Sequence, residues 1–171
     1  MRFYEMIALV FLGILASAIG EDFPDESSGD YAYDADAIEA AMKSIIDCDN
    51  AMGLDEDSTV EGAEFSHQGL ALVNVTTWQG YCDWWSFVGN GPLVGFSVDA
   101  RDIGYDEEDN AIVYAATITA THTGEGMPFP PTNMTTISDY AYWALLDDDY
   151  KIVSVKKIWN DFYAMTELGW I

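Results

Sequence analysis

Four stretches in the second half of the chain have the hydrophobic and polar patterns of β-strands, namely residues 93–103, 112–123, 135–146 and 151–159. Polar residues alternate with hydrophobic ones most clearly in the first two. Acidic or proline-rich segments separate the stretches: YDEEDN, GEGMPFPPTN and DDDY. Strands joined in this way predict a curved antiparallel sheet.

The second of these strands contains His122. Its alternation places His122 on the same face as Ile112, Tyr114 and Ile118, so we expect it on the concave, helix-covered side. In residues 135–146 both faces are partly apolar, so the pattern does not decide which face points inward.

The first half of the chain predicts two helices. Asp36 and Glu39 form a capping-box start for an amphipathic helix that ends at Asn50 and Gly53. An acidic segment, in which a short helix could form, follows to about Glu64. Thr76 and Gln79 open a second helix, whose main stripe is Trp78, Tyr81, Cys82 and Trp85.

Residues 65–75 are ambiguous between a short strand and a loop, and a last short helix starts at Asn160 or Asp161. The predicted fold is therefore α+β, a cone-shaped bent antiparallel sheet with helices on one face. A lipocalin-like barrel would need about twice as many strands.

The N-terminus has the features of a secretory signal peptide. An apolar run from Met6 to Ile19 follows Arg2, and Ala16-Ser17-Ala18 supplies a cleavage site. We expect residues 1–20 to be the signal peptide, 21–33 a flexible acidic leader and 34–171 the folded domain. An uncleaved signal anchor is the alternative. The expected location is outside the cell or in the lumen of the secretory pathway, with no membrane attachment after cleavage.

In an exported protein, asparagine glycosylation and disulfide formation become possible. Asn74 and Asn133 begin glycosylation sequons. Cys48 and Cys82 are the only cysteines, and an oxidising compartment would allow a disulfide between them. Two free buried thiols are equally compatible with their apolar stripes.

The net charge of −24 argues against nucleic acid and anionic membrane surfaces as partners. The acidic clusters lack the glycine and distant glutamate of an EF-hand loop. His67 and His122 have no zinc-ligand spacing, and no nucleotide-binding motif or G-x-S-x-G elbow is present. We therefore expect no metal and no cofactor.

The motif H-T-G-E at residues 122–125, followed by P-P-T, K-I-V and W-N-D, resembles the SnoaL-like branch of the nuclear transport factor 2-like superfamily, with its cystatin-like cone. The resemblance implies a cavity for a hydrophobic small molecule and acid–base catalysis without a cofactor. It implies His122 as the catalytic acid or base, with Asp139, Asp83 or Asp161 as candidate partners. The expected ligand-contacting residues are Tyr81, Trp85, Tyr114, Tyr140, Tyr142 and Trp159.

Two functions remain open at this point. The first is an isomerase, cyclase or dehydratase of the polyketide cyclase or ketosteroid isomerase type. The second is a non-catalytic module of the same fold that binds a small molecule or forms a homodimer through the sheet. His67 is expected to be a surface or hydrogen-bonded loop residue rather than part of the site.

Overall fold

The computed structural model describes residues 33–69 and 74–171. The expected signal peptide and nearly all of the expected leader lie outside these residues. Residues 34–171 form one unit, whose elements follow in the order α2 (Ala35–Asp49), β1 (Thr59–His67), α3 (Trp78–Asn90), β2 (Ser97–Asp106), β3 (Ala111–Thr121), β4 (Thr135–Leu146), β5 (Ile152–Trp159) and α4 (Asp161–Glu167). The α+β class is confirmed.

The sheet has five strands in the order β1-β5-β4-β3-β2. β2, β3, β4 and β5 pair antiparallel, as predicted, but β1 pairs parallel with β5. The sheet is therefore mixed, and the expectation of a purely antiparallel one was wrong.

β1 also replaces the short helix considered before Glu64. Its register shifts between Thr59 and Glu64, where Gly62 has a φ of 77°. Such an irregularity interrupts the two-residue period. Only Ala63 and Phe65 then keep the inward alternation, with Glu64 exposed between them. This short signal explains why the sequence left the stretch from Phe65 ambiguous between a strand and a loop and did not extend the strand back to Thr59.

The helix starts differ slightly from the prediction. Asp34, not Asp36, caps α2, and its carboxylate accepts a hydrogen bond from the Ala37 amide at 3.1 Å. Thr77, not Thr76, caps α3 through the Gly80 amide, also at 3.1 Å. In both places two suitable capping residues lie close together in the sequence, and composition alone does not choose between them.

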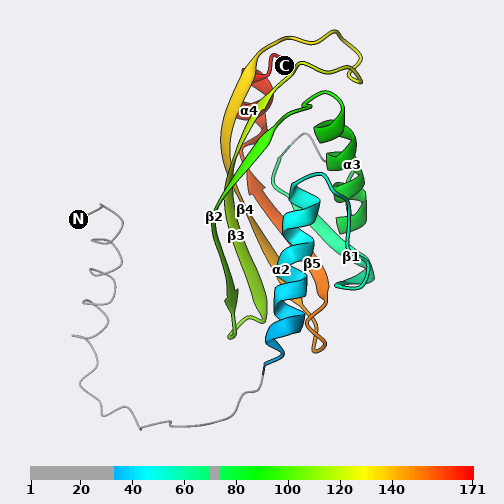
Figure 1. Cartoon of the computed structure of the whole chain (residues 1–171), viewed down its shortest axis with the longest axis vertical. Coiled ribbons are helices and arrows are strands. Elements are labelled where there is room, and N and C mark those ends of the chain that lie inside the picture. Colours follow the sequence, from blue (N-terminus) through cyan, green and yellow to red (C-terminus); the bar gives the residue numbers. More distant parts are fainter. Residues whose placement is uncertain (1–32, 70–73) are drawn as a thin grey trace, which may run out of the picture. The chain divides into compact units, whose positions relative to one another are not determined.

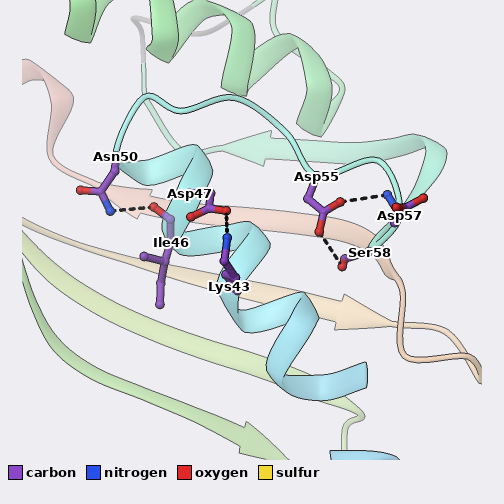
Figure 2. A network of polar contacts seen from close by, with 7 residues as sticks. All are labelled: Lys43, Ile46, Asp47, Asn50, Asp55, Asp57 and Ser58. Carbon is purple, nitrogen blue, oxygen red and sulfur yellow. Dashed lines mark hydrogen bonds and ion pairs between the residues drawn. The ribbon is translucent and has the colours of Figure 1, made fainter. Parts of the chain in front are cut away.

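Polar contacts at the end of α2 direct the chain toward β1 (Figure 2). The Asn50 amide group donates to the Ile46 carbonyl at 2.9 Å and closes the last turn. The Asp55 carboxylate then accepts from the Asp57 amide and the Ser58 hydroxyl, at 3.1 and 2.9 Å. On the solvent side of α2, Lys43 and Asp47 form an ion pair.

The helices α2 and α3 lie on the same side of the sheet (Figure 1). The predicted stripe of α3 is buried at all four of its positions, Trp78, Tyr81, Cys82 and Trp85. On β3, Tyr114, Ile118 and the following His122 are buried on one face, as the alternation predicted. β4 resolves the open question of its orientation by burying Tyr140 and Tyr142.

β2 begins at Ser97, four residues later than predicted, because residues 91–95 form turns in which Gly95 has a φ of 83°. Within residues 33–69 and 74–171, no helix is both long and apolar enough to cross a membrane.

A disulfide joins Cys48 at the end of α2 to Cys82 in α3. The two residues are 34 positions apart and fully buried. The bridge therefore fastens together the two helices that cover the sheet.

We expect replacement of both cysteines by serine to lower the free energy of unfolding by about 3 to 4 kcal/mol, because the unfolded chain loses its cross-link. Urea unfolding of the oxidised protein and of this variant measures the difference. Thiol titration of the denatured, unreduced protein should find no reactive thiol, and two reactive thiols would contradict the bridge.

Candidate functional site

A carboxylate is buried at the end of α2. Asp49 is only 1% exposed, and its two oxygens accept hydrogen bonds from three tyrosines. Tyr114 and Tyr140 donate to Oδ2 at 2.9 and 2.5 Å, and Tyr142 donates to Oδ1 at 2.9 Å. Three phenol donors compensate for much of the hydration that the carboxylate loses.

A lysine on β5 completes this arrangement. Lys157 is 4% exposed, and its ammonium group donates to the hydroxyls of Tyr81 and Tyr142 at 2.6 and 3.1 Å. These two hydroxyls are 2.7 Å apart. Since Tyr142 donates to Asp49, the consistent assignment is a chain from Lys157 through Tyr81 and Tyr142 to Asp49. We call Asp49, Tyr81, Tyr114, Tyr140, Tyr142 and Lys157 the polar centre.

Aromatic rings surround the Lys157 ammonium. Its nitrogen lies within 6 Å of five ring centroids: Tyr140 at 4.5 Å, Trp159 at 4.8 Å, Tyr81 at 4.9 Å, Tyr142 at 5.0 Å and Trp85 at 5.8 Å. Such contacts stabilise a cation through the negative faces of the rings. A buried positive charge is therefore held by rings and hydroxyls rather than by a directly contacting carboxylate.

Sheet register and the disulfide bring these residues together. Tyr114 of β3 pairs with Tyr142 of β4, so their rings stack at 5.8 Å on the inner face. Asp49 and Tyr81 are the chain neighbours of Cys48 and Cys82. The disulfide therefore holds Asp49 and Tyr81, two members of the hydrogen-bonded chain, near each other.

Burial changes the acidity of these groups. It lowers the pKa of Lys157 to about 8, since desolvation disfavours the ammonium form, and the nearby Asp49 opposes this shift. Burial and then the negative charge of Asp49 raise the pKa values of Tyr81, Tyr114, Tyr140 and Tyr142. The phenols therefore stay protonated over the whole physiological range.

A groove of about 770 Å³ lies beside the polar centre, lined by His67, Gln68, Gly69, Asp139, Ile158, Trp159, Asn160, Asp161 and Phe162. It is open to solvent and mixes polar with apolar side chains. Trp159 belongs to both places, because its ring lines the groove and also contacts the Lys157 ammonium.

His67 and Asp161 meet in this groove. A Cβ atom added to Gly69 would lie 2.2 Å from His67 Cε1 and 2.4 Å from Asp161 Oδ2, so both side chains pack against the same point. Burial lowers the pKa of His67, Asp161 opposes this shift and Lys157 adds to it. His67 is thus part of an accessible site, although the sequence suggested an ordinary loop histidine.

His122 lies elsewhere. It is completely buried, and its Nδ1 is 3.2 Å from both the amide nitrogen and the hydroxyl of Thr132. The rings of Phe129 and Trp170 pack edge-on against it. This histidine holds the proline-rich loop and the C-terminal residues against the sheet.

The structure does not bring the predicted carboxylates to His122. Asp139 is on the outer face, where it accepts from Thr117 at 2.6 Å and pairs with Arg101 at 3.4 Å. Asp83 is exposed on α3 and accepts from Gln79 at 2.8 Å. Asp161 lines the groove with His67 instead. The pairing of His122 with a catalytic acid therefore has no geometric basis in the described residues.

In contrast, the structure gathers all six expected ligand-contacting aromatic residues around Lys157 and Asp49: Tyr81, Trp85, Tyr114, Tyr140, Tyr142 and Trp159. The two charged residues were missed. The sequence did contain a signal that both residues face inward. Asp49 follows Ile45 at helical spacing, and Lys157 alternates in phase with Val155 and Trp159.

No family model and no curated protein matches the sequence. Solved structures do match. IdmH from Streptomyces antibioticus, described as a candidate polyketide cyclase, superposes with a TM-score of 0.59 at 16% identity over 77% of this chain and 98% of its own. The fold is SnoaL-like.

Two more structures support the SnoaL-like fold. A candidate SnoaL-like polyketide cyclase from Jannaschia sp. CCS1 matches with a TM-score of 0.58 at 12% identity over 77% of this chain and 90% of its own. The BvnE pinacolase from Penicillium brevicompactum matches with a TM-score of 0.57 at 9% identity over 82% of this chain and 93% of its own. At these identities the likeness establishes the SnoaL-like architecture alone.

The polar centre predicts a sharp contrast between two neighbouring aspartates of α2. Asp49→Asn should lower the free energy of unfolding by roughly 3 to 5 kcal/mol, because it leaves the buried Lys157 charge uncompensated. Asp47→Asn, which breaks only the surface pair with Lys43, should cost less than about 1 kcal/mol. Urea unfolding measures both, and equal losses would contradict the assigned role of Asp49.

The lowered pKa of Lys157 predicts a rise in stability with pH. Between about pH 8 and 10.5 the unfolded chain retains the Lys157 proton that the folded protein releases. The unfolded state then binds more protons, so the free energy of unfolding should increase by roughly 1 to 2 kcal/mol from pH 8 to 9.5. Below pH 8 the Lys157 side chain is charged in the folded protein, so the full free-energy cost of burying its ammonium group lowers the stability.

Urea unfolding across this pH range tests the expectation. Lys157→Met should remove the rise, whereas Lys156→Met, at the exposed neighbouring position, should retain it. A rise that persists without Lys157 would assign it to other groups.

Proposed function

We propose that the protein binds a hydrophobic small molecule and acts on it as a cofactor-free acid–base catalyst of the isomerase, cyclase or dehydratase type. One observation carries this proposal: a hydrogen-bonded chain from Lys157 through Tyr81 and Tyr142 to Asp49 is enclosed in a SnoaL-like fold. The candidate cyclases and the pinacolase with this fold support the choice of reaction class.

The polar centre has the components that such chemistry requires. Each phenol already donates its single proton, Tyr81 to Tyr142 and the other three to Asp49, so a ligand oxygen that gains negative charge would replace one of these acceptors, and a dry environment strengthens such bonds. Lys157, with a pKa of about 8, can exchange a proton near neutral pH. A ligand in the groove would reach these groups past Trp159, which lines the groove and whose ring centroid is 4.8 Å from the Lys157 ammonium.

A non-catalytic binding or dimerising module is the second candidate. All six side chains of the polar centre already have hydrogen-bond partners, as in a structural core. The outer face of the sheet also exposes apolar side chains, including Ile137 at 62% and Ile158 at 51%. A second copy of the chain packed on this face would bury them.

A hydroxyl deletion in the polar centre distinguishes the two functions. Binding of polyketide, steroid and terpenoid compounds is followed by tryptophan fluorescence, and turnover by mass spectrometry. Tyr140→Phe keeps the ring next to Lys157 but removes the bond to Asp49, so it should lower turnover by at least about 100-fold with little change in affinity.

Tyr163→Phe, on the exposed side of α4, is the matched control and should behave like wild type. Binding without turnover in the wild type supports the non-catalytic module. Wild-type rates in Tyr140→Phe exclude the polar centre as the catalytic group, and no binding across the panel contradicts both functions.

We also propose that the protein enters the secretory pathway. The apolar segment 6–19, the disulfide and the exposed positions of Asn74 and Asn133 support this. In a eukaryotic secretory host the chain should appear in the medium with glycans on these asparagines. Glycosidase treatment should lower its mass, Asn74→Gln with Asn133→Gln should abolish that change, and full-length unprocessed chain in the cytosol would contradict export.

A further inference from the structure

The groove at the end of β1 combines accessible apolar side chains with negative charge. Three of its lining side chains are well exposed, namely Asp139 at 73%, Phe162 at 59% and Ile158 at 51%. Asp161 also lines the groove but is buried, so its charge acts on a ligand only through space. Among the described residues, no lysine or arginine belongs to the lining. A ligand that enters therefore meets an accessible carboxylate beside apolar surface.

The Asp139 carboxylate can accept a further hydrogen bond. The Thr117 hydroxyl at 2.6 Å and the Arg101 guanidinium at 3.4 Å both contact Oδ1, and none of the described residues bonds to Oδ2. Thr117 is on β3 and Arg101 follows on β2, so both lie on the side of Asp139 that is away from β5. The groove is on the β5 side, at Ile158 and Trp159. Neither contact therefore occupies the groove side of Asp139.

Charge restricts the kind of ligand that this groove can hold. An anion would be repelled by Asp139, Asp161 and the net charge of −24. A calcium or magnesium ion needs about six oxygen ligands, and the described residues contain no group of three or more acidic, histidine or cysteine side chains that could hold a metal ion. An uncharged molecule over Asp139 would remove water from the carboxylate without replacing its bonds. An organic ammonium ion avoids all three penalties.

The rest of the lining fits an ammonium group attached to an apolar body. Gln68 and Asn160 are exposed in the groove, and their amide carbonyls can accept bonds from the three donors of an ammonium group. Phe162 and Ile158 offer apolar surface to the body of the molecule. The groove volume of about 770 Å³ is in the range of small-molecule sites, about 300 to 1,000 Å³.

We propose that this groove binds a small arylalkylamine in its ammonium form, with Asp139 as the paired carboxylate and Phe162 and Ile158 against the aromatic ring. The acidity of the whole chain acts in the same direction, because a net charge of −24 raises the concentration of cations near the surface. The site uses no residue of the polar centre, so it is independent of the function proposed there.

Three probes with the same phenyl body separate charge from shape: 2-phenylethylamine, 2-phenylethanol and 3-phenylpropanoate. Calorimetric titration at pH 7 and low ionic strength should show the amine binding at least about fivefold more tightly than the alcohol, the upper range for an exposed ion pair. The carboxylate should not bind. Added sodium chloride at about 0.5 M should remove most of the preference for the amine, because salt screens exposed charges.

A fourth probe distinguishes a small aromatic ligand from a lysine side chain of another protein. n-Butylamine has the ammonium end of a lysine side chain without the ring, so it should bind more weakly than 2-phenylethylamine. Equal affinities of these two amines would contradict the aromatic ligand.

Two matched variants locate the charge that binds the amine. Asp139→Asn keeps the shape of the side chain and an oxygen for the Thr117 bond, and it should make the affinities for amine and alcohol nearly equal. Asp148→Asn removes the same charge in the exposed turn between β4 and β5, and it should retain the preference. Phe162→Ala should weaken amine and alcohol to a similar degree, because it removes apolar contact alone.

NMR of ¹⁵N-labelled protein locates the ligand. The amine should shift the side-chain amide signals of Gln68 and Asn160 and leave those of Asn110, in the turn between β2 and β3, unchanged. Unshifted groove signals, equal binding of amine and alcohol, a preference that survives Asp139→Asn or one that is lost in Asp148→Asn would each overturn the proposal. These measurements involve no turnover, so they are separate from the test of the polar centre. If Asp139→Asn does not fold, the probe comparison and its salt dependence in the wild type still decide.

Discussion

The burial of Asp49 is the constraint on which the rest of this structure depends. A carboxylate removed from water must be compensated, and three phenols from two neighbouring strands fulfil this requirement. Tyr114, Tyr140 and Tyr142 can converge only if β3 and β4 keep their register, because a slip by one residue would turn the tyrosines of the shifted strand outward. Asp49 on α2 thereby favours one register between β3 and β4.

The same network joins the helical layer to β5. Lys157 on β5 is linked to Asp49 on α2 through Tyr81 of α3 and Tyr142 of β4, so four elements share one set of hydrogen bonds. The chain contains four lysines and carries a net charge of −24, yet one lysine is placed in the core. The surrounding rings make this arrangement tolerable, since cation–π contacts replace part of the lost hydration.

The sequence predicted the parts of the fold that rest on clear periodicity. β4 was found at its observed bounds, the buried stripe of α3 was found, and His122 was placed on the correct face. β1 was predicted only as an ambiguous stretch from Phe65 on, because a register shift breaks its alternation. Its parallel pairing with β5 is a long-range choice that local pattern does not encode. The aromatic members of the candidate site followed from the resemblance to the SnoaL-like branch. Asp49 and Lys157 did not, because charged residues on apolar faces are ordinarily taken for surface positions.

A double-mutant cycle between Asp49→Asn and Lys157→Met tests the central claim most directly, since it measures whether the two buried charges form one energetic unit. Urea unfolding at pH 7 gives the free energies of the wild type, both single variants and the double variant. The account predicts that the double variant is more stable than the sum of the single effects by at least about 2 kcal/mol, because removing both charges leaves neither one uncompensated. Losses that add to within about 0.5 kcal/mol would mean that Asp49 and Lys157 are buried independently and would contradict it.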